Sequence, residues 1–247
     1  MLNKRVLILG GTREAREVAA ALMAAGIPAV TSLAGVTETP VLPEGEVRRG
    51  GFGGVTGLTS YLRAERIALT VDATHPFAAR ISVNAVDACR DAGVPLLRLE
   101  RPPWTPQEGD RWTQVKTVEE AAARLRPAAR VLLTIGRKEI APFMARSGIG
   151  GIARMIEPPP LALPPGWSLI LERPPFSIGA EKHLLAQNAI GWLVTKNAGG
   201  GDTDAKLVAA RELDLPVIMI EQPAKPFAPI FASTREIFLN VKRVLSP

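Results

Sequence analysis

Short apolar segments rich in β-branched residues alternate with alanine-rich segments of helical composition along almost the whole chain. Near the N-terminus, Arg5–Leu9 and Pro28–Leu33 have the composition of buried strands, and Glu14–Ala25 between them reads as a helix that ends at Gly26. Strands that are separated by helices form a parallel sheet with helices packed against its faces. The alternation therefore predicts an α/β protein.

Helix signals in the second half of the chain support the same fold class. Asp202 or Thr203 is expected to cap a helix that follows a run of three glycines. The spacing Ser233-x-x-Glu236 predicts a capping box at the start of a final helix.

A proline-rich stretch divides the chain. With 247 residues, the chain can form one large α/β domain or two smaller ones. The alternation is interrupted by "ERPPWTP" at 100–106, so we expect one domain over residues 1–99 and a second over residues 100–247. A likeness between "VLILGGTREA" at 6–15 and "VLLTIGRKEI" at 131–140 suggests a similar strand-turn-helix in each half, although shared architecture explains it equally well.

The apolar segments are too short to cross a bilayer, which takes about 18 to 20 residues. The N-terminal residues run directly into a strand and lack the features of a secretory signal. The single cysteine, Cys89, cannot form an internal disulfide and is expected in the core. We therefore expect a cytoplasmic protein without a membrane partner.

The formal net charge is +6 at pH 7, and arginine carries most of the positive charge. Guanidinium groups bind carboxylates and phosphates through paired hydrogen bonds, which favours a small polyanionic substrate. An arginine-rich surface without a ligand is the alternative. The basic residues are scattered and aromatic residues make up 5% of the chain, so a nucleic-acid partner is disfavoured.

Four loops stand where a parallel sheet binds its ligands, at the carboxyl ends of strands. They are Gly10–Glu14, the glycine-rich loop at 50–54, "DATHPF" at 72–77 and "KNAGGGDT" at 196–203. Paired glycines permit a positive φ and let a phosphate approach the backbone N–H groups. The first loop lacks the third glycine of a dinucleotide fingerprint, so a plain strand-to-helix turn stays an alternative.

The second strand ends without the acidic residue that NAD-binding proteins place about 20 residues after the glycine turn. Thr31 and Ser32 occupy that region, and Arg13 stands beside the turn. Hydroxyl groups and a nearby guanidinium would tolerate a 2′-phosphate, which favours NADP over NAD if a dinucleotide binds. Two polar residues at a strand end are an equally good explanation.

Two further residues are candidates for chemistry. His75 stands at a strand end, where it could donate to a ligand or carry a proton. The alternative is a histidine that is locally hydrogen-bonded or that caps a helix whose first turn contains Pro76. Lys196 follows an apolar strand and either faces a ligand or is a solvated charge at the strand end. Neither a cluster with metal-ligand spacing nor a G-x-S-x-G elbow is present.

Taken together, the motifs "LILGGTREA", "GGFGG", "DATHPFA", "ERPPW" and "VTKNAGGGDTDAKLVAARELDLPVIMI" resemble the precorrin-6A reductase family of the cobalamin pathway. The resemblance extends over nearly the whole chain and preserves the order of the motifs. Two places depart from the family pattern: Ala198 replaces a serine in the lysine-asparagine-glycine loop, and "ERPPF" at 172–176 replaces a form closer to "GPF". A role for a hydroxyl at residue 198 is therefore not expected.

The resemblance implies two Rossmann-like domains with parallel sheets and a ligand cleft between them. It also implies an NADPH-dependent reduction of a double bond in the precorrin-6A macrocycle, which gives precorrin-6B. A tetrapyrrole with many acetate and propionate carboxylates would account for the arginine excess. Other enzymes of the cobalamin pathway are the protein partners that the resemblance suggests.

The motifs that carry the resemblance also imply which residues form the site. The cofactor would be held by Gly10, Gly11, Thr12, Arg13, Ser32, Thr74, His75 and Pro76, with His75 also a candidate proton donor. Lys196, Asn197, Gly199 and Gly200 would line the cleft from the second domain, in contact with substrate or cofactor. Two other functions stay open: an NADP-dependent reductase of another small anionic substrate, and a non-enzymatic nucleic-acid-binding protein.

Overall fold

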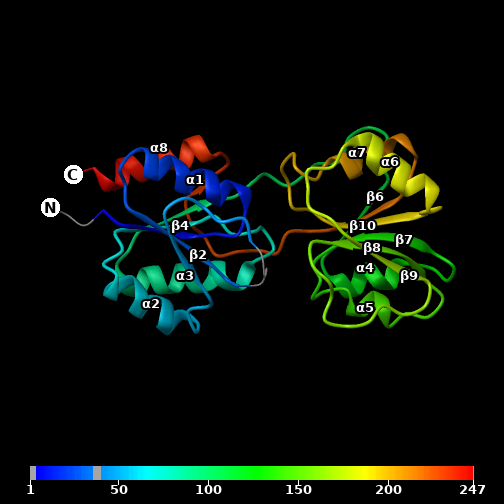
Figure 1. The fold of residues 1–247 in the computed structure, drawn as a ribbon, viewed down its shortest axis with the longest axis horizontal. Coiled ribbons are helices and arrows are strands. Elements are labelled where there is room, and N and C mark those ends of the chain that lie inside the picture. Colours follow the sequence, from blue (N-terminus) through cyan, green and yellow to red (C-terminus); the bar gives the residue numbers. More distant parts are fainter. Residues whose placement is uncertain (1–3, 36–39, 247) are drawn as a thin grey trace. The chain divides into compact units, whose positions relative to one another are not determined.

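A computed structural model describes residues 4–35 and 40–246, and Figure 1 shows their fold as helices and strands. The chain divides into two units. Unit 1 contains the residues up to Pro102 together with those from Pro223 onward, and unit 2 contains Pro103–Gln222. Each unit contains one six-stranded sheet in which all neighbouring strands are parallel.

The sheet of unit 1 has the strand order β12-β5-β4-β1-β2-β3. Its strands are β1 (Val6–Leu9), β2 (Ala29–Leu33), β3 (Glu46–Arg49), β4 (Leu69–Asp72), β5 (Leu96–Leu99) and β12 (Ile230–Phe231). The central strands β1, β2 and β4 are buried along their whole length, because helices cover both faces of the sheet.

Two pairs of helices cover the sheet of unit 1. They are α1 (Arg13–Ala24) with α8 (Thr234–Leu245) on one face, and α2 (Val55–Ala64) with α3 (Ala79–Ala92) on the other (Figure 1). One core contains Val18 and Leu22 of α1 together with Ile237 and Val241 of α8. The opposite core includes Cys89, whose buried position confirms the prediction for that residue.

The sheet of unit 2 has the order β6-β11-β10-β7-β8-β9. Its strands are β6 (Trp112–Val115), β7 (Arg130–Thr134), β8 (Gly150–Met155), β9 (Trp167–Leu171), β10 (Trp192–Lys196) and β11 (Val217–Ile220). Its helices are α4 (Val118–Arg124) and α5 (Ala141–Met144) on one face, with α6 (Ile178–Gln187) and α7 (Ala205–Glu212) on the other. The predicted α/β class with two parallel sheets is therefore confirmed.

Both sheets repeat the strand order 3-2-1-4-5 of a Rossmann half, with β1 and β7 in the central first position. The sixth strand is exchanged between the units. β6 follows β5 in the chain but completes the sheet of unit 2, and β12 follows β11 but pairs with β5 of unit 1. The likeness between residues 6–15 and 131–140 thus falls on topologically equivalent strands.

The exchange corrects the predicted domain limits. Residues 100–247 were expected to form the second domain, but the structure places the residues from Pro223 onward in unit 1. The physical reason is that β12 bonds to β5 and that α8 packs its apolar face onto α1. The first limit, after residue 99, lies three residues before the boundary at Pro102.

Helix starts follow local chemistry where a side chain can reach the backbone. Ser233 and Glu236 form the expected capping box of α8. The expected caps of α7 at Asp202 or Thr203 are wrong, because α7 begins after Asp204, which makes no side-chain capping bond. The glycine-rich turns before α7 allow the chain to enter the helix later than the sequence pattern indicates.

We expect Ile237→Ala to lower the free energy of unfolding of unit 1 by about 2 to 4 kcal/mol, the usual cost of a cavity in a packed core. Ile237 is fully buried against α1, whereas Leu239 of the same helix is 54% exposed. Leu239→Ala is therefore the matched control and should change the stability by less than about 0.5 kcal/mol. Urea unfolding of both variants tests the assignment of α8, and equal effects would contradict it.

Candidate functional site

The turn between β1 and α1 is held by Thr12, the N-cap of α1. Its hydroxyl accepts a hydrogen bond from the Ala15 N–H at 3.1 Å and donates one to the Ala73 carbonyl at 2.8 Å. The same side chain therefore starts the helix and ties the turn to the end of β4. Two of the loops that the sequence singled out are joined by this contact.

The two glycines of the turn serve different purposes. A Cβ on Gly10 would lie 2.7 Å from the Thr31 side chain, so Gly10 permits close packing of the turn against β2. Gly11 has a φ of +114°, and a Cβ there would meet nothing within 4 Å. Open space above a glycine with positive φ, at the N-terminus of α1, leaves room for a phosphate group.

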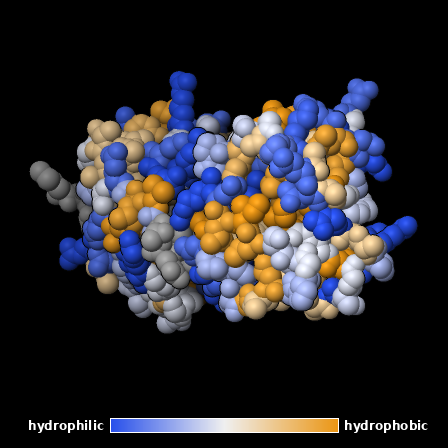
Figure 2. Space-filling model, turned by 45° about the vertical axis from the view of Figure 1, so that its right-hand side comes forward, coloured by the Kyte–Doolittle hydropathy of each residue, from blue (hydrophilic) through white to orange (hydrophobic). Residues whose placement is uncertain are grey.

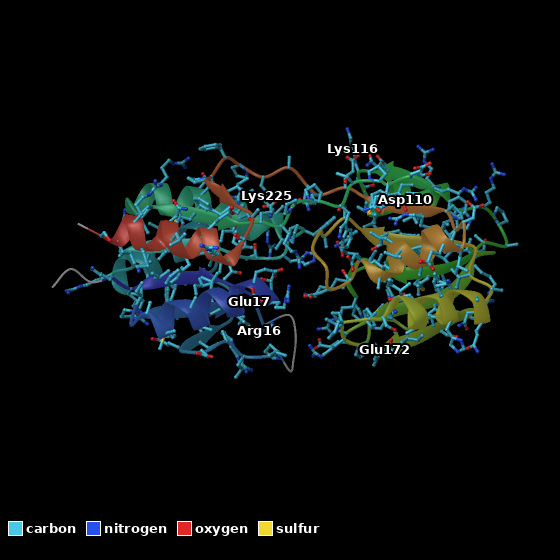
Figure 3. The ribbon with its side chains drawn as sticks, turned by 90° about the horizontal axis from the view of Figure 1, so that it is seen from above. Arg16, Glu17, Asp110, Lys116, Glu172 and Lys225 are labelled. Atoms are coloured by element: carbon cyan, nitrogen blue, oxygen red, sulfur yellow. The ribbon has the colours of Figure 1, made fainter. Side chains whose placement is uncertain are left out.

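Charged side chains at the start of α1 are engaged with one another. Arg13 is 53% exposed and lies 3.6 Å from Glu17, while Glu14 pairs with Arg101 at 3.1 Å. Arg16 reaches back to the Thr12 carbonyl at 3.4 Å, and Figure 3 labels Arg16 and Glu17 on this helix. The role of Arg13 in cofactor binding stays a prediction.

Arg48 is a candidate that the sequence reasoning missed. It lies opposite Ser32 in the register of β2 and β3, and its Nη1 is 3.4 Å from the buried Ser32 hydroxyl. Its Nη2 donates to the Gly51 carbonyl at 2.8 Å, and its guanidinium lies 3.9 Å from the centre of the Phe52 ring. Ser32 therefore stands where NAD-binding proteins place an acid, and a cation lies beside it on the neighbouring strand. The short strand β3 carries no apolar run that would have revealed this pairing.

The loop after β4 is organised by Asp72. This buried carboxylate accepts a bond from the Thr74 hydroxyl at 2.7 Å and one from Arg98 Nε at 3.1 Å. The hydrogen bond between the Thr74 hydroxyl and Asp72 therefore shapes the loop that follows β4. A small pocket is lined by Thr12, Glu14, Ala73, Thr74, Pro76, Leu99, Glu100 and Arg101.

His75 is exposed, and its Nδ1 accepts a hydrogen bond from the Phe77 N–H at 3.2 Å. A neutral ring that accepts at Nδ1 carries its proton on Nε2. The locally bonded alternative therefore describes this geometry. The expected helix start at Pro76 is wrong, because residues 76–77 form a turn and α3 begins at Ala79 after an Ala78 cap.

In unit 2, the residues after β10 gather around Trp104. Asn197 is buried, accepts from the Trp104 N–H at 2.7 Å and donates to the Trp104 carbonyl at 2.9 Å. The Trp104 indole donates to the Gly200 carbonyl at 2.8 Å, while Gly199 adopts a φ of +65°. The amide of Asn197 thus holds the start of unit 2, and its expected contact with a ligand stays a prediction.

Lys196, at the end of β10, forms an ion pair with Glu139. Its side chain is 13% exposed, whereas that of Glu139 is 39% exposed. The lysine is therefore largely buried instead of being a fully solvated strand-end charge. Its contact with a substrate or cofactor stays a prediction.

Lys206 on α7 is a second residue that the sequence reasoning missed. It is buried, donates to the Thr203 carbonyl at 2.8 Å and lies 5.1 Å from the centre of the Trp104 ring. Desolvation, assisted by the nearby Arg154 guanidinium, lowers the pKa of Lys206 to about 7, although Glu181 and Asp204 act in the opposite direction. The local sequence does not indicate this burial, because a lysine on a helix usually points to solvent.

Comparison with known proteins identifies the family. The family model described as Precorrin-6x reductase CbiJ/CobK matches residues 5–245. The chain belongs to this family. A precorrin-6A reductase of Rhodococcus erythropolis is 48% identical over 224 residues, which cover 90% of each chain. One of Rhodobacter capsulatus is 46% identical over 231 residues, 93% of this chain and 92% of the relative.

A solved structure supports the same assignment. The structure of CobK precorrin-6A reductase superposes with a TM-score of 0.91 at 44% identity, covering 97% of this chain and 96% of that one. The family is one of oxidoreductases, which is consistent with a nicotinamide cofactor.

No helix among the described residues is long and apolar enough to span a bilayer. Hydrophilic and hydrophobic residues are mixed over the face drawn in Figure 2.

The titration of Lys206 predicts how stability changes with pH. Below pH 7 the lysine is protonated in both states, so burial of the charge opposes folding. Between pH 7 and its ordinary pKa of 10.5, the unfolded chain binds a proton that the folded chain has released, so the free energy of unfolding rises with pH. Lys206→Met removes this contribution.

We therefore expect the melting temperature of Lys206→Met, relative to that of the unmodified protein, to fall steadily between about pH 6.5 and pH 9.5. Lys182→Met is the matched control, because Lys182 is a half-exposed lysine paired with Glu212. Its difference from the unmodified protein should stay nearly constant. If the difference in melting temperature from the unmodified protein stays constant with pH for both variants, the result contradicts a lowered pKa at Lys206.

Proposed function

We propose that the protein reduces a double bond of precorrin-6A to give precorrin-6B in cobalamin biosynthesis, with NADPH as the hydride source. The observation that carries the proposal is the family match over residues 5–245, together with relatives that bear the name precorrin-6A reductase at 46% and 48% identity. The open glycine turn of unit 1 supplies a binding site of the kind that a dinucleotide needs.

The residues around the turn fit a dinucleotide. The pyrophosphate would lie over Gly10 and Gly11, at the N-terminus of α1, where the helix dipole and free N–H groups favour negative charge. Thr12 holds the turn in place by its bond to Ala73. Arg13, Ser32, Thr74, His75 and Pro76 complete the proposed cofactor site.

The preference for NADPH rests on β2 and β3. Ser32 stands in place of the acid that would repel a 2′-phosphate, and Arg48 lies against its hydroxyl. A guanidinium can form paired hydrogen bonds with a phosphate, and it is already oriented by the Gly51 carbonyl and the Phe52 ring. We therefore assign the 2′-phosphate to Arg48 and Ser32.

NADPH, when bound, supplies the hydride for the macrocycle. The chain's own contribution is mainly to position two ligands, because correct orientation removes much of an entropic barrier. The proton that follows the hydride comes from water or from His75, whose Nδ1 accepts from the Phe77 N–H. Lys196 with Asn197, Gly199 and Gly200 would contact a ligand from unit 2.

The proposal is tested by mixing the protein with NADPH and precorrin-6A in the absence of oxygen. We expect the NADPH absorbance to fall together with a shift in the visible spectrum of the macrocycle. Protein without precorrin-6A and precorrin-6A without protein are the controls. No loss of NADPH above these controls would contradict the proposed reaction.

Arg48→Gln should weaken NADPH binding about tenfold or more while leaving the weaker binding of NADH almost unchanged, because only NADPH carries the 2′-phosphate. Arg49→Gln is the matched control, since neighbouring residues of a strand point to opposite faces. Calorimetric titration of both variants with both cofactors measures the effect. An equal loss for NADPH and NADH in Arg48→Gln would contradict the assignment.

A further inference from the structure

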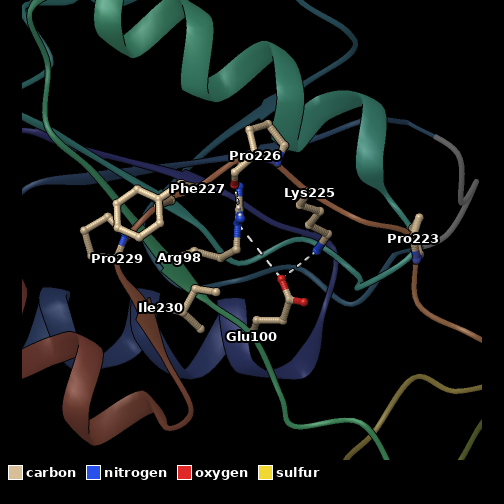
Figure 4. A pocket seen from close by; sticks show the side chains of 9 residues that line it. Arg98, Glu100, Pro223, Lys225, Pro226, Phe227, Pro229 and Ile230 are labelled. Atoms are coloured by element: carbon tan, nitrogen blue, oxygen red, sulfur yellow. Dashed lines mark hydrogen bonds and ion pairs between the residues drawn. The ribbon is translucent and has the colours of Figure 1, made fainter.

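A cavity of about 520 Å³ lies in unit 1 beside the end of β5. Figure 4 shows its lining, formed by Arg98, Glu100 and the returning segment from Pro223 to Ile230. This segment connects β11 to β12, so the exchanged strand carries one wall of the cavity. The proposed roles of the glycine turn do not involve these residues.

Arg98 has a donor that the protein does not use. Its side chain is 2% exposed, its Nε pairs with Asp72 at 3.1 Å and its Nη1 donates to the Pro226 carbonyl at 2.9 Å. The buried Nη2 has no hydrogen-bond partner among the described residues. An unpartnered buried donor is costly and calls for a ligand or an ordered water.

A second cation lies on the same wall. The Lys225 side chain is 5% exposed and its Nζ donates to Glu100 at 2.8 Å, while Arg98 Nε lies 4.0 Å from the same carboxylate. Figure 3 labels Lys225, and Figure 4 draws its contact with Glu100. With the Asp72 carboxylate behind Arg98, the cluster contains two cations and two carboxylates, so its charges balance before a ligand enters.

The rest of the lining is apolar. Pro223, Pro226 and Pro229 contribute to the wall, and Phe227 is 90% exposed. An unused guanidinium donor and a lysine beside an exposed aromatic ring suit a ligand that combines a carboxylate with an extended apolar ring system.

The cavity adjoins the proposed cofactor loops. Glu100 lines both this cavity and the small pocket formed by Thr12, Thr74 and Pro76. Asp72 also connects them, because it binds Thr74 with one oxygen and Arg98 with the other. A ligand in the cavity would therefore lie next to the loops that bind the cofactor.

We infer that this cavity receives a carboxylate arm of the tetrapyrrole substrate, with Arg98 Nη2 and Lys225 Nζ as the donors and Glu100 as the residue that positions Lys225. The inference rests on the proposed function and extends it to a specific substrate contact in unit 1. Phe227 would lie against the ring system that carries the arm.

Lys225→Gln tests the inference, since glutamine can keep a hydrogen bond to Glu100 but loses the charge. We expect the KM for precorrin-6A to rise about tenfold, with kcat and the KM for NADPH changed less than about twofold. Lys182→Gln is the matched control, because Lys182 also pairs with a glutamate, at 2.7 Å, but lies in unit 2 on α6. It should leave all three constants unchanged.

Arg98→Lys provides a second test that preserves the charge opposite Asp72 while removing Nη2 together with the Nη1 bond to the Pro226 carbonyl. Circular dichroism and a melting curve establish that each variant is folded. A rise in the KM for precorrin-6A in both folded variants supports the inference, and unchanged values in a folded Lys225→Gln overturn it.

A binding titration separates this inference from the proposed reaction. Precorrin-6A is added without NADPH, and its visible absorbance reports the dissociation constant for the unmodified protein and for Lys225→Gln. Weaker binding by Lys225→Gln supports the substrate contact in the cavity, whether or not NADPH is consumed. A failure to consume NADPH would contradict only the proposed reaction. Equal dissociation constants overturn the pocket even if the reaction proceeds.

Discussion

The buried ion pair between Asp72 and Arg98 connects three parts of unit 1. Asp72 ends β4 and shapes the following loop through Thr74, and Arg98 reaches from β5 to the Pro226 carbonyl of the returning segment. A buried charge without its partner is strongly destabilising, so both residues must be present together. The pair therefore couples the glycine-turn side of the sheet to the exchanged C-terminal strand, and it places one unused guanidinium donor at the wall of a cavity.

Each sheet gains its sixth strand by pairing at the edge of its fifth strand. A Rossmann half with five strands exposes the edge of its last strand, whose backbone groups need partners. In unit 1, β12 supplies these to β5, and in unit 2, β6 supplies them to β11. Neither sheet is completed by the strand that directly continues it. Because β12 is two residues long, its place depends on the packing of the following helix, where Ile237 and Val241 are buried against α1.

Several residues of the candidate site have contacts in the structure that differ from the roles expected from the sequence. Thr74 and Asn197 were expected to face ligands, yet their side chains bond to Asp72 and to the backbone of Trp104. Each side chain holds the loop of its own unit, Thr74 the loop after β4 and Asn197 the segment that contains Trp104. Arg48 and Lys206 were not expected as candidates, because neither belongs to an apolar pattern and each has, besides local bonds, a contact with a distant residue, Ser32 for Arg48 and Trp104 for Lys206.

The sequence by itself determined the α/β class, the central strands, the glycine turn and the family, because these depend on local composition and on the order of motifs. β1, β2, β4 and β10 are apolar runs within buried sheets, so their pattern is strong. Only the tertiary structure decided the edge strands, since β3 is largely charged, β12 is two residues long, and both exist through pairing with β2 and β5. It likewise decided where residues 223–247 belong and which charges are buried, because contacts between distant segments have no signature in local sequence.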